Sequence, residues 1–366
     1  MTQSAQPHAS LPLIVAVATM IGGCGTSGLT LESLRPGSGA CYDRSSMDQT
    51  SLVDTHLHFR PFGGPAIPFE EVVSYLTRSG VLFANIYGIG QMLPVSSPCT
   101  YYLDCPGTPV VPKLTNDVVN AANVVTLAPE DVHLTLSMTF PDLSNPESIL
   151  RGIQLLDTEF PNMFTWMGEV NLVKQALFNN GHQPVSSAAI KEWAVFMDIL
   201  RQRDIPLAIH ADLGNDQDPV RYLPVLKEVL QLYPDNKIVW MHMGLSKELA
   251  NMDVREHIQI IQPLLDRYPN LMIDIAWRML EDNYFSRPER RRYYIPFLNA
   301  YSDRVLPGTD FVAAAGKDYQ VYETELQATS RINRHLNDAA FRNIALGQNY
   351  FRLLGLDYEA PPICLN

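Results

Sequence analysis

Eight short runs of apolar and β-branched residues, each followed by a longer amphipathic stretch, constrain the fold of this chain more than any other sequence feature. A short apolar run is typical of a buried strand, and apolar residues three or four apart are typical of a helix packed on one face. Buried strands that alternate with helices form a parallel sheet, and eight such units close a barrel. The predicted strands are Leu52–His56, Val81–Tyr87, Val132–Thr139, Thr165–Val170, Pro206–Ala211, Lys237–His242, Leu271–Ala276 and Arg304–Gly308.

Helical patterns occupy the segments between these strands. An open doubly wound sheet would need a glycine-rich phosphate turn after its first strand, where this chain has HLHFRP instead. The predicted fold is therefore α/β, a (β/α)8 TIM barrel with a long insertion after the second strand and a C-terminal helix. The predicted helices are Pro68–Ser79, Pro146–Phe160, Ser187–Arg203, Tyr222–Tyr233, Val254–Tyr268, Arg290–Tyr301 and Tyr319–Leu336.

Two further segments stand outside the eight repeating units. Gly90–Glu130 is far longer than a usual loop, so we expect a lid with a short helix at Asn116–Val124. Asp338–Leu356 predicts a last helix packed on the barrel. The barrel is expected to span residues 51–356, and residues 357–366 form a C-terminal tail.

Composition limits the class of partner. Of the 366 residues, 46% are hydrophobic and 18% charged, which is enough apolar material for a sizeable core and argues against disorder. The formal net charge of -12 would repel a duplex nucleic acid. We therefore expect no nucleic-acid partner, while a homo-oligomer is allowed.

The N-terminus is typical of an exported protein. Leu11–Gly23 is apolar, too short to span a bilayer comfortably, and ends in small residues before Cys24, which predicts a signal peptide over residues 1–23. The run IGGC that ends at Cys24 resembles the bacterial lipobox, which implies lipidation of Cys24 and a membrane contact through that anchor alone. No Lys or Arg precedes Arg35, so the usual positive region is missing, and a buried N-terminal segment is the alternative. We expect a protein of the bacterial periplasm or an outer-membrane-anchored lipoprotein. Residues 24–50, rich in Gly, Ser and Thr, suit a flexible tether.

Cysteine usage fits an exported chain. Apart from Cys24 there are four cysteines, an even number that allows two disulfides. Cys99 and Cys105 are close in sequence, so a local disulfide between them is favoured, and Cys41 with Cys364 would join the two tails. Metal binding by the four is the alternative, but their spacings match no zinc-ribbon pattern.

Side chains that can bind metal ions lie at the carboxyl ends of the predicted strands, the face where barrels of this kind place catalysis. The two at the end of the first strand, His56 and His58, are two residues apart, so both imidazoles leave one face of an extended chain. Each residue alone could be structural, but together they would be several costly buried polar groups that need separate partners. Nitrogen and oxygen donors without thiolate suit Zn, Mn, Fe or Ni. They are His56, His58, Glu169, His210, His242 and Asp310.

The ordered strings DTHLH, GEV, IHADLG, WMHMGLS and GTDF resemble the amidohydrolase superfamily over Ser51–Leu356. The ending FRNIALGQNYFRLLGL resembles the terminal helix of the amidohydrolase-2 branch. The resemblance implies a metal-dependent hydrolase in which a metal-bound hydroxide cleaves an amide, ester or lactone bond of a small molecule, with phosphoester hydrolysis as a variant.

The resemblance also implies roles for the site residues. Asp310 would act as general base and then acid. With two ions, Glu169 would bridge them; with one, His242 would instead polarise the substrate. One or two divalent ions are thus expected, with zinc favoured and Mn, Fe or Ni as alternatives. The two-ion ligand set is His56, His58 and Asp310 for the first metal and His210 and His242 for the second; the one-ion set is His56, His58, His210 and Asp310.

Substrate contacts are less constrained by the sequence. Arg60 follows the paired histidines and Arg278 follows the seventh strand, so either could bind a substrate carboxylate or phosphate, or could be a solvent-exposed loop residue. Trp277 and Tyr87 could form an apolar wall or belong to the core.

Three other functions stay open. A mononuclear metal-dependent decarboxylase or hydratase of the amidohydrolase-2 branch needs one ion only. A TatD-like nuclease shares the GE motif, but the acidic composition argues against it. A non-catalytic surface binding lipoprotein with a decayed site would not need all six candidate ligands.

Overall fold

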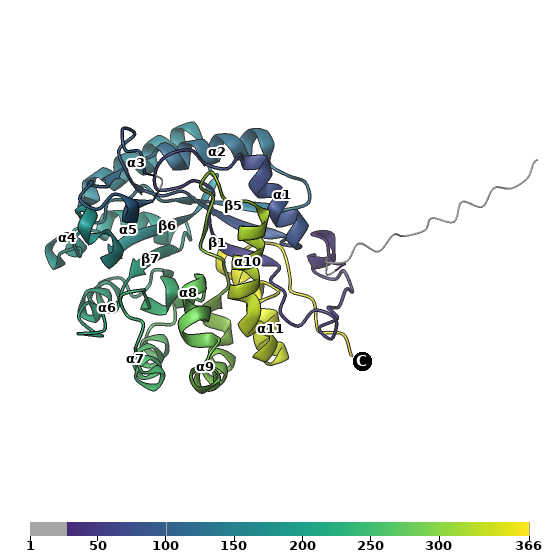
Figure 1. The fold of residues 1–366 in the computed structure, drawn as a ribbon. Coiled ribbons are helices and arrows are strands. Elements are labelled where there is room, and N and C mark those ends of the chain that lie inside the picture. The colour runs from purple at the N-terminus through teal and green to yellow at the C-terminus, as the bar shows by residue number, and fades with distance from the viewer. Residues whose placement is uncertain (1–27, 100, 366) are drawn as a thin grey trace, which may run out of the picture.

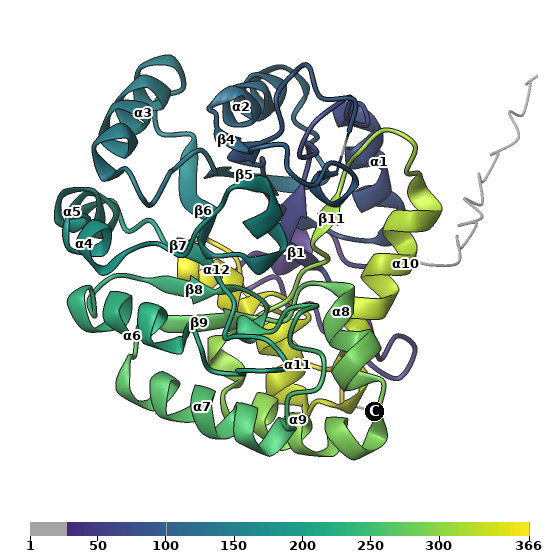
Figure 2. The same ribbon diagram turned by 60° about the vertical axis from the view of Figure 1, so that its left-hand side comes forward.

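The computed structural model describes residues 28–99 and 101–365. Parallel strands form a ring at the centre, and helices cover its outside (Figure 1 and Figure 2). All eight predicted strands have a counterpart in this ring. The strands are β1 (Val53–His58), β2 (Phe83–Tyr87), β5 (His133–Met138), β6 (Phe164–Val173), β7 (Leu207–Ala211), β8 (Ile238–Trp240), β9 (Leu271–Asp274), β10 (Val305–Leu306) and β11 (Phe311–Val312).

The sheet closes through its last two strands. Their order is β10-β9-β8-β7-β6-β5-β2-β1-β11, and every pair is parallel. β10 pairs with β9 while β11 pairs with β1, and only Pro307–Asp310 separates the two. They are two halves of the eighth barrel strand, so the predicted (β/α)8 barrel is confirmed.

The helices pack on the barrel with one apolar face. In α1 (Phe69–Ser79), Val72 and Leu76 are fully buried, and the helix ends at Gly80, whose φ of 73° is left-handed. The side chain of Asp253 caps the start of α7 by accepting hydrogen bonds from two backbone N–H groups. The other helices are α2 (Thr115–Leu127), α3 (Pro146–Glu159), α4 (Ser187–Lys191), α5 (Ala194–Gln202), α6 (Leu223–Leu232), α7 (Val254–Arg267), α8 (Arg278–Leu280), α9 (Pro288–Ala300), α10 (Tyr319–Ser330), α11 (Asp338–Ile344) and α12 (Gln348–Leu354).

Three predicted helices are divided in the structure. The segment Ser187–Arg203 forms α4 and α5, and the helix expected to reach Leu336 ends as α10 before a 3-10 turn at Arg331–His335. The C-terminal segment forms α11 and α12, which Gly347 separates with a φ of 89°. Apolar periodicity continues across such breaks, so it could not locate them.

The insertion after β2 covers part of the barrel mouth. It contains an antiparallel pair, β3 (Gln91–Met92) with β4 (Val111–Pro112), and then α2, which is longer than the predicted helix. A disulfide joins Cys99 and Cys105. Asn180 Nδ2 donates to the carbonyl oxygens of Cys105 and Thr108, both at 2.8 Å, which fastens the insertion to the loop after β6.

Residues 28–50 pack against the barrel, where the composition predicts a flexible tether. Leu34 and Tyr42 are almost fully buried. A disulfide joins Cys41 to Cys364, and Arg44 donates to the side chain of Asp338 at 2.7 Å. Two apolar anchors and a crosslink order a segment whose composition lacks an apolar period.

The predicted signal peptide, residues 1–23, and the predicted lipidation site, Cys24, lie outside the described residues. Within the described part of the chain, no helix is both long and apolar enough to cross a membrane.

Candidate metal centre

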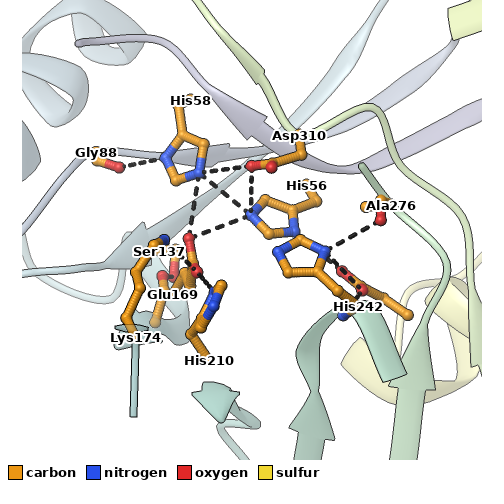
Figure 3. Close-up of polar contacts among 12 residues, drawn as sticks. His56, His58, Gly88, Ser137, Glu169, Lys174, His210, His242, Ala276 and Asp310 are labelled. Carbon is orange, nitrogen blue, oxygen red and sulfur yellow. Dashed lines mark hydrogen bonds and ion pairs between the residues drawn. The ribbon is translucent and has the colours of Figure 1, made fainter. Parts of the chain in front are cut away.

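Four of the six predicted ligands meet at the carboxyl mouth of the barrel (Figure 3). His56 Nε2 and His58 Nε2 are 3.2 Å apart. Glu169 Oε2 lies 3.6 and 3.4 Å from these two nitrogens, and Asp310 Oδ1 lies 3.4 and 3.3 Å from them. A tetrahedral ion with ligands at about 2.1 Å separates those ligands by about 3.4 Å. Five of the six pairs among the four donor atoms therefore have a spacing at which these residues could hold one divalent ion.

Hydrogen bonds at the far ring nitrogens orient the two histidines of β1. His56 Nδ1 lies 2.9 Å from Asp274 Oδ2, and His58 Nδ1 lies 2.6 Å from the Gly88 carbonyl oxygen. When each Nδ1–H donates to its oxygen, each Nε2 keeps a lone pair that points toward the other donors. This arrangement is what a metal ion requires of imidazole ligands.

The electrostatics of the cluster favour a cation among these groups. Burial alone would raise the pKa of Asp310, but the imidazoles around it, that of His56 first, hold this pKa well below its usual range. Burial opposes protonation of His56, yet the surrounding carboxylates raise its pKa well above the ordinary value. The carboxylates thus stay ionised, and the site attracts positive charge.

Left-handed backbone conformations place several side chains at this mouth. Among the described residues, six non-glycine residues have positive φ, and four of them are here: His242, Met243, Trp277 and Asp310. Each such conformation costs on the order of 1–3 kcal/mol unless its surroundings hold it. Asp310 N donates to the His56 carbonyl oxygen at 2.8 Å, which is one such restraint.

Asp54 ties β1 to the segment that carries Asp310. Its carboxylate accepts hydrogen bonds from Thr309 N at 2.9 Å and Thr309 Oγ1 at 2.8 Å. Burial raises the pKa of Asp54 to about 6. Gly308 allows the close approach, since a Cβ there would lie 2.9 Å from the Cβ of His56.

Glu169 also faces a second group of residues. Its Oε1 lies 2.9 Å from Lys174 Nζ and is hydrogen-bonded to His210 Nδ1. The other ring nitrogen of His210 is 2.9 Å from Asp212 Oδ1. His210 therefore lies between two carboxylates, and neither of its ring nitrogens faces the four-donor cage.

His242 completes this second group. Its Nδ1 lies 3.0 Å from the Ala276 carbonyl oxygen, so when Nδ1–H donates there, Nε2 keeps its lone pair. Burial lowers the pKa of His242, which favours this neutral form. Donor atoms of Glu169, His210 and His242 lie within 4.8 Å of one another.

A cavity of about 790 Å³ opens over the site. Arg278 lines it, with its Nε 3.2 Å from Asp282 Oδ2, and Trp277 forms part of its wall. Arg60, the other predicted substrate contact, lies elsewhere: its Nε donates to Asn116 Oδ1 at 3.0 Å, and it lines a separate cavity. Helix α2 of the insertion supplies a partner that the sequence did not reveal.

Tyr87 belongs to the core beneath the histidines. It is fully buried, and its ring centroid lies 4.8 Å from that of His56. The sequence reasoning missed three charged residues of the site: Lys174, Asp212 and Asp274. For Asp274 a signal existed, because it is the one charged residue in the apolar run LMIDIA.

A closed parallel barrel with nitrogen and oxygen donors gathered at its carboxyl mouth defines the class of protein as a (β/α)8-barrel enzyme with a candidate divalent-metal centre. The chain matches the amidohydrolase family over residues 53–347. It therefore belongs to the amidohydrolase family and is a metal-dependent hydrolase.

One solved structure agrees with this fold. The chain is similar to an amidohydrolase from Burkholderia multivorans with bound zinc, at a TM-score of 0.51 and 14% identity, covering 83% of this chain and 99% of that one. It is also similar to dihydroorotase from Campylobacter jejuni, at a TM-score of 0.45 and 15% identity, covering 78% and 82%. Among curated protein sequences there is no significant match.

Proposed function

We propose that this protein hydrolyses an amide, ester or lactone bond of a small molecule with the help of a divalent ion. Zinc is the favoured ion. The observation that carries the proposal is the four-donor cage of His56, His58, Glu169 and Asp310, whose close nitrogen and oxygen donors and ionised carboxylates would hold a divalent ion. A bound divalent ion supplies Lewis-acid chemistry, which polarises an acyl oxygen and lowers the pKa of water. Zinc also occurs in the similar amidohydrolase from Burkholderia multivorans.

Asp310 is the residue of the cage best placed to move a proton. Its side chain is 17% exposed and lines the cavity, whereas that of Glu169 is only 4% exposed. It is ionised near neutral pH, because its pKa is lowered, and an ionised carboxylate at this place could accept a proton from water and pass it to the leaving group. Asp310 is thus our general base and general acid.

We propose that His242 does not polarise the substrate by donating a hydrogen bond, and we assign it a different role. Because its Nδ1–H donates to Ala276 and its pKa is lowered, its Nε2 is an acceptor. A neutral acceptor in this position orients water or a substrate N–H.

Cationic side chains on the cavity wall suggest a substrate with an anionic group. Lys247, Arg278 and Lys317 line the cavity alongside the carboxylates of Glu248, Asp282 and Glu325, and Trp277 adds an apolar surface. Lys247 and Lys317 lie over aromatic rings, at 5.8 Å from the Trp277 centroid and 4.9 Å from that of Phe311. We propose that a carboxylate of the substrate binds here.

A mononuclear decarboxylase or hydratase is the second candidate. The observation in its favour is that Lys174 and His210 already occupy Glu169 Oε1, so a one-ion site satisfies the geometry. Release of carbon dioxide, or addition of water across a double bond, without any acyl hydrolysis, would identify a decarboxylase or a hydratase.

We also propose that the chain is exported, with residues 1–23 as a signal peptide and Cys24 as a lipidation site. The apolar run before Cys24 and the two disulfides support this proposal, since disulfides persist in oxidising compartments. Mass spectrometry of the mature N-terminus tests it.

The direct test of the function is a substrate panel. Purified protein loaded with zinc or manganese is assayed on esters, lactones, amides and phosphotriesters, each with and without a carboxylate. We expect turnover of at least one carboxylate-bearing acyl compound, and its loss after chelation. Absence of turnover together with bound metal would contradict the hydrolase proposal, and absence of metal would favour a non-catalytic binding protein.

A further inference from the structure

Lys174 lies on the side of Glu169 that faces away from the paired histidines of β1 (Figure 3). Its Nζ is 2.9 Å from Glu169 Oε1, while Oε2 faces His56 and His58. The two oxygens of one carboxylate therefore serve two separate sets of neighbours. A carboxylate that bridges two metal ions would instead give each oxygen to an ion.

The position of Lys174 is fixed by its surroundings. Its side chain is only 12% exposed, and the residue follows directly after β6. Its backbone N–H donates to His182 Nε2 at 3.2 Å, and the next backbone N–H, of Gln175, donates to Asp212 Oδ2 at 2.7 Å. The ammonium group could leave Glu169 only by giving up a buried, charge-assisted hydrogen bond.

An ammonium group at this position competes with a second metal ion. The donors available to such an ion are those of Glu169, His210 and His242. An ion bound to Oε1 at about 2.1 Å would lie no more than about 5 Å from Lys174 Nζ. Both cations would share the lone pairs of one oxygen and would repel each other in a buried site where solvent screens little.

We propose that Lys174 takes the place of a second metal ion. The centre then holds one ion in the cage of His56, His58, Glu169 and Asp310, and Lys174 supplies the positive charge on the other side of the carboxylate. Lys174 is a positioning residue, because it holds Glu169 with Oε2 turned toward the ion. This inference rests on the metal centre of the proposed function and adds the number of ions and the reason for it.

Metal counting on the full folded chain tests this role. The protein is equilibrated with excess zinc, freed of unbound metal, and analysed by inductively coupled plasma and native mass spectrometry. We expect one zinc ion per chain in the unaltered protein and two in Lys174→Met, in which the ammonium group no longer occupies Glu169 Oε1. Lys174→Arg keeps the positive charge and should retain one ion, as should the surface control Lys227→Met. Circular dichroism verifies folding, and Lys174→Gln is the second neutral variant should Lys174→Met not fold.

Two tightly bound ions in the unaltered protein, or a count that stays at one in a folded neutral variant, would overturn the inference. The count is independent of turnover, so the two proposals can fail separately. One ion in the unaltered protein and two in the neutral variant, without hydrolysis of any substrate, support the role of Lys174 and contradict the hydrolase proposal. Two ions in the unaltered protein, with hydrolysis, do the reverse. A chain that binds no ion contradicts both.

Discussion

The two sides of Glu169 differ in what they offer to a metal ion. On one side, the imidazoles of His56 and His58 present lone pairs, because their other nitrogens are hydrogen-bonded to Asp274 and Gly88. On the other side, Lys174 and His210 present positive charge or N–H groups to the carboxylate. The comparison teaches that residue type does not decide ligation: a histidine becomes a ligand only when its second nitrogen has a suitable partner.

The largest effect is expected from removing the proposed general base, Asp310, on the side of Glu169 that faces His56 and His58. In Asp310→Asn we expect kcat on the substrate identified by the panel to fall by about 10² to 10⁴, because the amide cannot accept the proton. Asp235→Asn, an exposed surface change, is the matched control and should leave kcat unaltered. Activity within about threefold of the unaltered protein in Asp310→Asn would remove this residue from the mechanism.

Low pH should lower the free energy of unfolding, because a buried histidine supports the backbone beside His242. The buried ring of His257 bonds to the Met243 carbonyl oxygen at 2.9 Å, next to His242, and burial lowers the pKa of His257 to about 4. The unfolded chain, with an ordinary histidine pKa near 6.5, binds more protons between these values, so stability is present above pH 6.5 and falls as the pH drops toward 4. The loss is on the order of 3 kcal/mol.

Urea unfolding of the metal-free protein at pH 7 and pH 4.5 measures this loss. Other buried groups titrate in the same window, so the comparison is with His257→Gln, whose loss should be smaller by that amount. An identical loss in the two proteins would show that His257 does not contribute.

The carboxylate partners of His56 and His210 should differ in their effect on metal binding. Asp274→Asn leaves His56 without its carboxylate partner, and we expect zinc affinity to fall by about 10- to 100-fold. Asp212→Asn alters the partner of His210 and should change the affinity by less than about threefold, since His210 does not bind the ion. Competition with a chromophoric chelator measures both, and equal losses would mean that His210 is a ligand after all.

The smallest expected effect lies on the cavity wall. Lys317→Met should raise KM for a carboxylate-bearing substrate by about three- to tenfold, because an ion pair at a half-buried wall contributes roughly 1 kcal/mol. KM for a neutral analogue should not change, nor should either value in the surface control Lys227→Met. A parallel rise for the neutral analogue would assign Lys317 to general packing rather than to charge recognition.

The sequence predicted the barrel and the place of the site because both follow from simple periodicities. Apolar runs located the eight strands, and the spacing of His56 and His58 placed two imidazoles on one face of a strand. What it could not predict depends on contacts between distant segments. Arg60 turns toward Asn116 of the insertion, and residues 28–50 are ordered by buried anchors and the Cys41–Cys364 disulfide.

Lys174 escaped prediction for a related reason. The predicted fourth strand ended at Val170, whereas β6 continues to Val173, so Glu169 lies within the strand and Lys174 follows its true end. A lysine after a strand is ordinarily a surface residue, and only the fold shows that this one points at a carboxylate.

Anomalous X-ray scattering from crystals loaded with zinc tests the central claim most directly. We expect one strong peak within about 2.0–2.2 Å of His56 Nε2, His58 Nε2, Glu169 Oε2 and Asp310 Oδ1, with Lys174 Nζ still beside Glu169 Oε1. A principal peak between His210 and His242, or four candidate ligands that remain unliganded under saturating zinc, would contradict the account.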